Sequence, residues 1–434
     1  MAYPKGSDLR KLVEYIEEYT RLKHEYGAGD AACLYADAGR KLEAVLERIK
    51  KLPVSDALLK KEPDGLNEIR ALREAGPRRL WLKLEEPRYM DRLQGAFIGR
   101  MAGCTLGAPV EFWTVEGMEK WAEYIGDRFP NQHYWSSIKN PNELRYKRSA
   151  CEDYTLQKMD GVPVDDDIVY TLLGLLIAED YGPDFTVEDV GAAWLKYLPY
   201  ACTAEDVALK NLKAGIPPRM VADVDNPYCQ WIGADIRSDP WGYMAPGWPE
   251  KAAEMAWNDA MISHRRNGVY GEMFFSAAIA AAFAVDDPLE AVRVGLTEIP
   301  AECALHADVL WALEAGKGIR DYRAARAAVD EHFDGMSGVH TNNNACLTVF
   351  GLMIGGGDFS RTIAETVAMG LDNDCTAATA GSIMGAVLGI GGIPAHWYER
   401  FNNKVYSYLN GPESFVISEL IERFLAQAVR VMGK

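Results

Sequence analysis

The stretch D-R-L-Q-G-A-F-I-G-R-M-A-G-C-T-L-G-A-P-V-E, residues 91–111, carries glycine at every fourth position, at Gly95, Gly99, Gly103 and Gly107. Residues four apart lie on one face of an α-helix, so these glycines form a ridge without side chains. Each of them costs about 1 kcal/mol relative to alanine in a helix interior. Dispersion contacts with a closely packed second helix would offset that cost. The stretch therefore predicts a helix that packs tightly against another helix.

A second small-residue helix is found in L-D-N-D-C-T-A-A-T-A-G-S-I-M-G-A-V-L-G, residues 371–389. Its small residues Ala377, Gly381, Gly385 and Gly389 repeat the same spacing. We expect the two helices to pack closely, although they are far apart in the sequence.

Helical periodicity also dominates the rest of the chain, while strand-like alternation is scarce. The fold class is therefore predicted to be all-α. Further helices are expected at 168–180, 187–196, 203–214, 249–263, 271–283, 288–296, 301–315, 324–332, 344–354, 359–369 and 413–431. Two long connections, 113–163 and 216–248, are rich in aromatic residues, and long ordered loops in helical proteins often carry binding sites.

The first part of the chain differs from the rest. Residues 9–23 and 31–52 are charged and amphipathic, and prolines separate the segments that follow. We expect residues 1–88 to form a helical extension that serves packing or homo-oligomer formation, and residues 89–434 to form the main domain.

Composition limits the classes of function. The chain has 434 residues, of which 48% are hydrophobic and 25% charged, which is typical of a globular protein. Its formal net charge of −17 argues against a nucleic-acid partner. The sequence shows neither an apolar signal region nor a membrane span, and its cysteines form no metal-binding or disulfide pattern. We expect a cytoplasmic protein with no membrane partner.

Aspartates gather before two of the predicted buried helices. Asp165, Asp166 and Asp167 precede one helix, and Asp372 and Asp374 precede the small-residue helix. Neighbouring carboxylates repel one another, and a hard divalent cation such as Mg²⁺ would offset that repulsion. Either group alone has a second interpretation, because aspartate is a favoured N-cap. The two groups together favour a shared metal site.

Glu111 follows the glycine ridge and Pro109. A carboxylate at the end of a helix that packs beside the metal-binding helix is a candidate general base. The alternative is an ordinary surface glutamate.

Together these motifs resemble the ADP-ribosylglycohydrolase family, which includes the dinitrogenase reductase-activating glycohydrolase. The resemblance covers about residues 89–409. It is carried by G-x-x-x-G-x-x-x-G-x-x-x-G-x-x-x-E at 95–111, D-D at 166–167, D-x-D at 372–374, A-A-x-A-G-x-x-x-G-A at 377–386 and I-P-x-x-W at 393–397. The segment W-I-G-A-D-I-R-S-D-P-W-G-Y, residues 231–243, resembles a bacterial branch whose substrates are poorly defined.

The resemblance implies a compact orthogonal multi-helix bundle that hydrolyses the glycosidic bond at C1″ of an ADP-ribosyl ribose. It also implies two Mg²⁺ ions, or Mn²⁺ in their place. By position, the metal ligands would be Asp165, Asp166, Asp167, Asp372 and Asp374, and the catalytic residues would be Glu111, Asp166 and Asp374. The chain departs from the family pattern at Cys104, Asp165, Ile168 and Cys375, which puts the number and identity of the metals in doubt.

Other residues are expected at the substrate cleft, which would take an ADP-ribose-containing or other N-glycoside substrate. They are Gly107, Asn226, Asp239, Trp241, Tyr243, His264, Tyr270 and His340. The aromatic members would stack on the base or close the cleft, and the alternative is that they fill a loop core.

The expected mechanism passes through an oxocarbenium-like centre. The metals would hold the 2″ and 3″ hydroxyls of the ribose, while Glu111 or one metal activates water. Two other functions stay open: a hydrolase of another small N-glycoside or nucleoside on the same scaffold, and a non-enzymatic ADP-ribose-binding or structural relative.

Overall fold

The computed structural model of the protein describes Tyr3 and residues 8–433. Residues 1–2, 4–7 and 434, at the ends of the two predicted domains, lie outside the described residues. Contacts divide the chain into a smaller unit, Met1–Lys60 with Asp334–Met336, and a larger unit, Lys61–Phe333 with Ser337–Lys434. Residues 61–88 group with the larger unit, whereas the division at 88/89 remains a prediction about where the catalytic domain begins.

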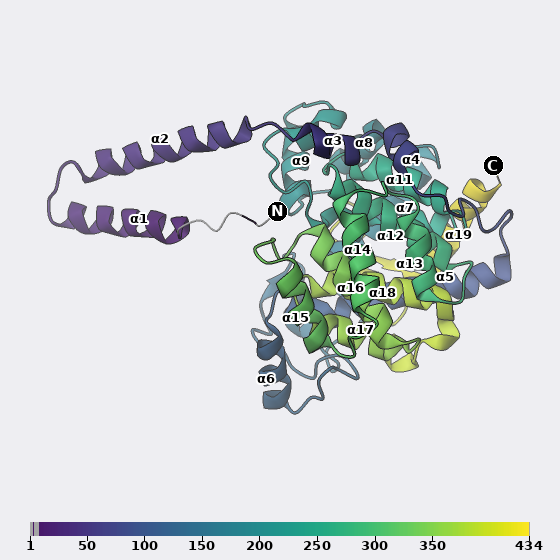
Figure 1. Cartoon of the computed structure of the whole chain (residues 1–434). Helices are drawn as coiled ribbons and strands as arrows, with labels where there is room; N and C mark the ends of the chain where they lie inside the picture. Colours follow the sequence, from purple (N-terminus) through teal and green to yellow (C-terminus); the bar gives the residue numbers. More distant parts are fainter. Residues whose placement is uncertain (1–2, 4–7, 434) are drawn as a thin grey trace. The chain divides into compact units, whose positions relative to one another are not determined.

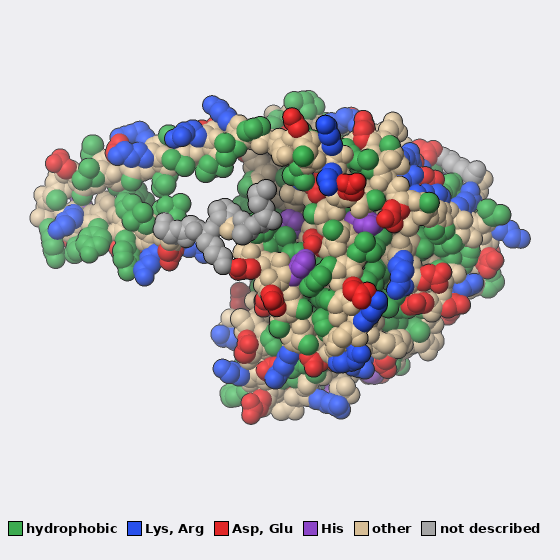
Figure 2. All heavy atoms as spheres, in the orientation of Figure 1, with side chains coloured by type: hydrophobic (Ala, Val, Ile, Leu, Met, Phe, Trp, Pro, Cys, Tyr) green, Lys and Arg blue, Asp and Glu red, His purple; other side chains and the backbone are tan. Residues whose placement is uncertain are grey.

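The smaller unit contains a helical hairpin of α1 (Leu9–Glu25) and α2 (Ala31–Lys50). Helix α1 begins at Asp8, whose side chain accepts a hydrogen bond from the backbone N–H of Lys11. Only Ala31 is buried among the residues of the two helices. Hydrophobic side chains therefore lie on the surface of this hairpin (Figure 2).

The larger unit is built from helices, which confirms the predicted all-α class. Its α-helices are α4 (Leu66–Leu72), α5 (Glu86–Gly107), α6 (Val115–Ile125), α7 (Asp166–Tyr181), α8 (Val187–Tyr197), α9 (Thr203–Lys213), α10 (Asp239–Met244), α11 (Pro249–Ala260), α12 (Asn267–Ala282), α13 (Pro288–Leu296), α14 (Ala304–Ala315), α15 (Tyr322–His332), α16 (Thr341–Gly355), α17 (Phe359–Ala368), α18 (Asn373–Leu388) and α19 (Ile417–Met432). Helix α3 (Asp56–Lys61) spans the division between the units.

Short 3₁₀-helices and two small hairpins complete the larger unit. The 3₁₀-helices are η1 (Ala108–Val110), η2 (Cys151–Tyr154), η3 (Pro218–Asp223), η4 (Ile232–Arg237), η5 (Ile390–Gly392), η6 (Ala395–Trp397) and η7 (Glu399–Phe401). Strand β1 (Leu144–Arg145) pairs antiparallel with β2 (Ser149–Ala150), and β3 (Lys404–Tyr406) with β4 (Ser414–Val416). No helix of the described chain is long and apolar enough to cross a bilayer.

Helices α5 and α18 form the centre of the larger unit and pack side by side in opposite directions (Figure 1). A Cβ atom placed on Gly95 would lie 2.2 Å from the carbonyl oxygen of Gly385, and one on Gly99 would lie 2.2 Å from that of Gly381. One turn further along, a Cβ on Gly103 would lie 2.0 Å from the carbonyl oxygen of Ala377. The backbones touch along the whole ridge, as the glycine spacing predicts.

The two long connections contain more regular structure than the sequence analysis expected. The first holds α6, the β1–β2 hairpin and η2, and the second holds η3, η4 and α10. These elements are short, so hydrophobic periodicity does not reveal them. The last predicted helix also begins later than expected, at Ile417, because Ser414–Val416 pair with β3 instead.

The helix contact gives a first prediction. Gly99→Ala should lower the free energy of unfolding by about 2 kcal/mol or more, because the added methyl group meets the backbone of Gly381 and forces the helices apart. Gly391→Ala is the control, since a Cβ there meets no atom within 4 Å. Urea unfolding followed by circular dichroism measures both variants. Equal stability of the two would contradict the close packing.

Candidate active site

The packing of α5 on α18 places a glutamate beside two aspartates. A Cβ atom on Gly107 would lie 2.5 Å from the Cα atom of Asp374. The chain continues through η1 to Glu111, and the N–H of Phe112 then donates to the carbonyl oxygen of Leu371 at 3.0 Å. Glu111, Asp372 and Asp374 each offer one carboxylate oxygen, and these oxygens all lie within 4.8 Å of one another.

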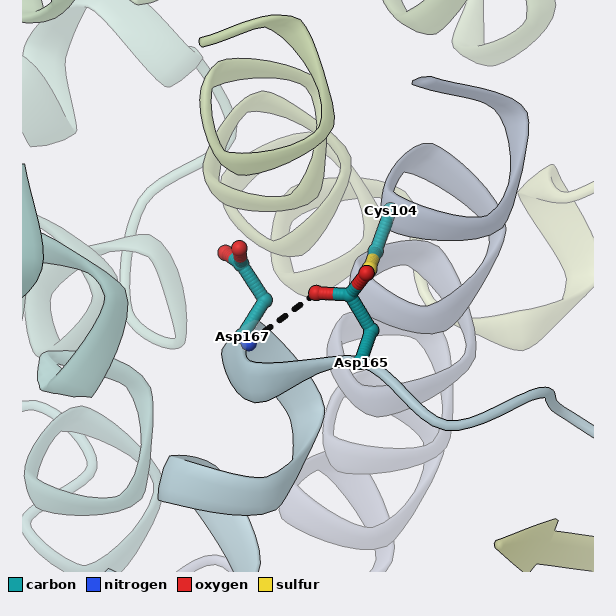
Figure 3. A group of neighbouring side chains, drawn as sticks. All are labelled: Cys104, Asp165 and Asp167. Atoms are coloured by element: carbon teal, nitrogen blue, oxygen red, sulfur yellow. Dashed lines mark hydrogen bonds between the residues drawn. The ribbon is translucent and has the colours of Figure 1, made fainter. Parts of the chain in front are cut away.

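Helix α7 brings the other three aspartates to the same place. Asp165 caps the helix by accepting a hydrogen bond at 3.1 Å from the backbone N–H of Asp167 (Figure 3). Asp166 and Asp167 lie in the first turn. The carboxylates of Asp165 and Asp167 also lie near the Cys104 sulfur of α5, with one ligand atom from each residue within 4.8 Å of the others.

Helix capping accounts for only part of this arrangement. Asp165 does cap α7, but Asp372 precedes α18 without a side-chain cap hydrogen bond. The Oδ1 atom of Asp374 is buried and has no hydrogen-bond partner among the described residues. A buried carboxylate oxygen without a partner is costly, which points to a ligand at this position.

Burial changes the acidity of the cluster. Desolvation raises the pKa of Asp166, Asp167, Asp372 and Asp374 well above the usual aspartate range, and the charges of neighbouring carboxylates raise it further. Burial likewise raises the pKa of Glu111, although the nearby Arg145 opposes the shift. The carboxylates therefore need cations close by if they are all to be ionised near neutral pH.

Two arginines supply part of that positive charge. Arg100, fully buried in α5, lies 2.6 Å from Asp239 and 3.3 Å from the carboxylate of Asp167. Arg145, at the end of β1, lies 2.8 Å from Asp165 and 2.8 Å from Glu111. Arg145 was not predicted from the sequence, because one arginine in a long connection carries no motif that marks it.

A cavity of about 200 Å³ opens at the acid cluster. Acidic, aromatic, aliphatic and small residues line it. The lining residues are Glu111, Phe112, Tyr146, Asp166, Asp167, Tyr170, Cys202, Thr203, Glu205, Trp231, Ile232, Gly233, Ile236, Val339, Asp372 and Asp374. None of these described residues is lysine, arginine or histidine, so the cavity wall itself offers no cationic side chain to an anion.

The aromatic residues expected at the cleft lie instead in the protein interior. The Trp241 indole N–H donates to Glu272 at 2.8 Å, and the Tyr243 hydroxyl donates to Asp239 at 2.9 Å. The Tyr270 hydroxyl donates to the Pro63 carbonyl at 2.6 Å. All three side chains are buried and none lines the cavity, which matches the alternative that they fill a core.

Three of the polar residues expected at the cleft also have interior partners. Asp239 is held by Arg100, and the Nδ1 atom of buried His264 lies 2.8 Å from the Ser263 hydroxyl. Asn226 donates to the Ser263 carbonyl at 2.9 Å. None of the three lines the cavity.

Gly107 and His340 lie nearer the site. Gly107 touches the backbone of Asp374 and so has a packing role. His340 caps α16 and follows Val339, which lines the cavity.

Residues from both long connections line the cavity. Their role there was not predicted from the sequence. Tyr146, from the β1–β2 turn, donates from its hydroxyl to Asp166 at 2.7 Å. Trp231, Ile232 and Ile236 come from the η4 segment. Only the aromatic content of these connections signalled such a role.

The donor atoms decide which metal the cluster fits. The group formed by Glu111, Asp372 and Asp374 consists of hard oxygen donors and includes the unpartnered oxygen of Asp374, so it fits Mg²⁺ or Mn²⁺. The group that contains Cys104 fits such an ion poorly, because burial raises the pKa of the thiol and leaves a neutral sulfur donor.

Comparison with known proteins agrees with this architecture. A solved structure described as an "ADP-ribosylglycohydrolase-related protein complex" is similar, with a TM-score of 0.52 and 18% identity over 80% of this chain and 100% of that chain. At this identity the likeness shows the fold alone. None of the curated proteins matches the chain. The model of the ADP-ribosylglycohydrolase family, however, matches residues 85–431, so the chain belongs to that family.

Proposed function

We propose that the protein is a metal-dependent hydrolase that cleaves the glycosidic bond at ribose C1 of an ADP-ribosylated protein or small molecule. The family membership implies a glycohydrolase acting on ADP-ribose-related substrates. The observation that carries the proposal is the convergence of Glu111 with the aspartates of α7 and α18 on one cavity.

The chain's own residues offer a proton acceptor for water and a cavity that limits solvent, two of the parts that glycoside hydrolysis needs. Glu111 lines the cavity, and its raised pKa suits a group that accepts a proton from water near neutral pH. The Tyr146 hydroxyl fixes the carboxylate of Asp166. Apolar side chains such as Trp231 and Ile236 limit the water around the bond that breaks.

A divalent cation would be held by Asp372 and Asp374 beside Glu111, and it would orient sugar hydroxyls and lower the pKa of a bound water. Asp165, Asp167 and Asp374 are buried, and Glu111, Asp166 and Asp372 are partly buried. Carboxylates brought together in this way destabilise a fold unless cations pair with them. Their convergence is the reason for favouring an enzyme over a non-enzymatic relative.

The cavity supports a second candidate. Its volume of about 200 Å³ is below the roughly 300–1,000 Å³ of typical ligand pockets, and its lining residues include no lysine or arginine. A ribose ring fits such a space better than a complete ADP-ribose with its charged diphosphate. Hydrolysis of a nucleoside or another small N-glycoside on the same scaffold is therefore the alternative.

The role of the acids can be tested directly. Asp374→Asn should lower kcat by about 10²-fold or more and abolish the thermal shift that Mn²⁺ produces, because the variant removes a charged ligand from the cluster. In EDTA the melting temperature of the variant should not fall, since the substitution removes a buried charge whose Oδ1 atom has no hydrogen-bond partner among the described residues. Asp287→Asn is the matched control, because Asp287 caps α13 away from the cavity and asparagine also caps helices. Full activity of Asp374→Asn would rule out the proposed mechanism.

The two candidate substrate classes are separated by a panel of compounds. We expect ADP-ribosyl-arginine or ADP-ribosyl-serine to release ADP-ribose in the presence of Mg²⁺, and we expect no release after exhaustive chelation. Chromatography of the products measures both reactions. Release of a free base from simple nucleosides, with no release of ADP-ribose, would establish the alternative.

A further inference from the structure

We propose that the Arg145 guanidinium is a built-in cation of the acid cluster, which takes the place of a second metal ion, so that the site holds a single divalent cation. This inference rests on the proposed function of the cluster as a divalent-cation site. It specifies that the site holds one divalent cation and that the Arg145 side chain takes the place of a second one.

The contacts of Arg145 span all three parts of the cluster. One terminal nitrogen donates to Glu111 at 2.8 Å and to the Ala108 carbonyl at 2.8 Å. The other donates to Asp165 at 2.8 Å and to Asp374 at 3.2 Å. A single guanidinium therefore bridges the end of η1, the start of α7 and the start of α18, as a bridging metal ion would.

Contacts of the β1–β2 hairpin hold Arg145 at the acid cluster. Arg145 pairs with Ser149 across the hairpin, and the turn between them has positive φ angles of 49° at Tyr146 and 56° at Lys147. The Tyr200 hydroxyl donates to the Tyr146 carbonyl at 2.7 Å. These contacts fix the backbone on both sides of the turn, so the guanidinium enters the cluster from an anchored position.

Aromatic rings surround the charge. The guanidinium carbon lies 5.4 Å from the centre of the Tyr146 ring and 5.6 Å from that of Tyr154. Aromatic faces attract cations, most strongly where water is excluded. The side chain of Arg145 is only 16% exposed, so it is a fixed part of the site.

A second divalent ion and Arg145 exclude each other. Asp165 would have to belong to the second ion, yet one of its oxygens already accepts from Arg145 and the other from the backbone N–H of Asp167. Asp167 already accepts from Arg100 at 3.3 Å, and the soft sulfur of Cys104 is a poor ligand for a hard ion.

One ion, in contrast, is compatible with Arg145. The Oδ1 atom of Asp374 is unpartnered, while Arg145 binds the other oxygen of that carboxylate. Asp372 and Glu111 lie within reach of the same position. The arginine thus pairs with Asp165 and with one oxygen each of Glu111 and Asp374, and it leaves Asp372 and the Oδ1 atom of Asp374 available to one ion.

Counting bound Mn²⁺ tests the inference. Titration of the metal-free full-length protein with Mn²⁺, with free ion measured by electron paramagnetic resonance, should give one tight site for the natural chain. Arg145→Met should bind a second Mn²⁺, because it removes the charge and keeps the length of the side chain. Arg148→Met is the matched control on the same hairpin, with a side chain that is 51% exposed, and it should still bind one ion.

Each outcome has a definite meaning. Two ions in the natural chain, or one ion in a folded Arg145→Met, would overturn the role of Arg145 and leave the proposed function intact. No ion in any variant would overturn both. Arg145→Lys keeps the charge and should stay at one ion, and it serves as the second variant if circular dichroism shows that Arg145→Met does not fold.

A separate observation concerns the α1–α2 hairpin, defined as residues 9–50. Large apolar side chains repeat at helical spacing along both helices and are exposed. They are Leu9, Leu12, Val13, Tyr15 and Tyr19 of α1, and Leu34, Tyr35, Leu42, Val45, Leu46 and Ile49 of α2. Such a face is typical of a surface that binds another chain.

We infer that the hairpin pairs with the same hairpin of a second copy to form a four-helix bundle. Helix α1 carries four basic residues, counting only lysine and arginine, and four acidic residues, while α2 carries four basic and three acidic ones. The hairpin is thus nearly neutral in a chain of net charge −17, so two copies approach there with little repulsion. The same overall charge disfavours an anionic membrane.

The size of the face suits a dimer. Helices of 17 and 20 residues are about 26 and 30 Å long, and two side by side are about 20 Å wide. A pair of such faces covers roughly 1,000 Å², which is the minimum for a specific interface. The symmetric pairing of identical faces needs no other partner.

Sedimentation equilibrium of the full chain should show a dimer at micromolar concentration. Leu42→Glu combined with Val45→Glu should give a monomer, because it puts charges in the apolar stripe. Arg40→Glu changes the net charge by the same amount on the opposite side of α2 and should remain dimeric. A monomeric natural chain, or an unchanged dimer in the double variant, would overturn the inference.

Discussion

The backbone contact between α5 and α18 is the constraint on which the rest of the structure depends. Glycine at every fourth position lets the carbonyl groups of one helix rest against the Cα atoms of the other. Glycine destabilises a helix relative to alanine, so the dispersion contacts of the close packing have to offset that destabilisation. The register of this contact sets Gly107 against Asp374, and Glu111 then follows after one short 3₁₀ turn. The position of the acidic cluster is therefore a consequence of helix packing.

The carboxylates of the cluster repel one another, and two arginines reduce that repulsion. Arg100 is buried and pairs with Asp167 and Asp239. Arg145, from the β1–β2 hairpin, pairs with Asp165 and Glu111. Buried charges are tolerated when they are paired and hydrogen-bonded, and the unpartnered oxygen of Asp374 is where this pairing stops. A bound cation would complete it.

The opposite wall of the cavity depends on a second buried network. Arg237 of η4 lies 2.7 Å from Asp259, 2.9 Å from Glu205 and 3.3 Å from Glu272. Glu205 also lines the cavity, and the Trp241 indole donates to Glu272. This network holds η4 in place, and Ile232 and Ile236 of η4 line the cavity.

The sequence by itself determined the all-α class, the pairing of α5 with α18 and the acidic residues beside them. Glycine spacing and aspartates before buried helices are local patterns, and the packing they predict follows from helix geometry. Only the tertiary structure decided which other residues meet the acids. Arg145 and Tyr146 reach the site through a short hairpin without a motif, whereas Trp241 and Tyr243 are buried in the core. The reason is physical: whether an aromatic side chain lines a cavity or fills a core depends on neighbours distant in sequence, which no local pattern encodes.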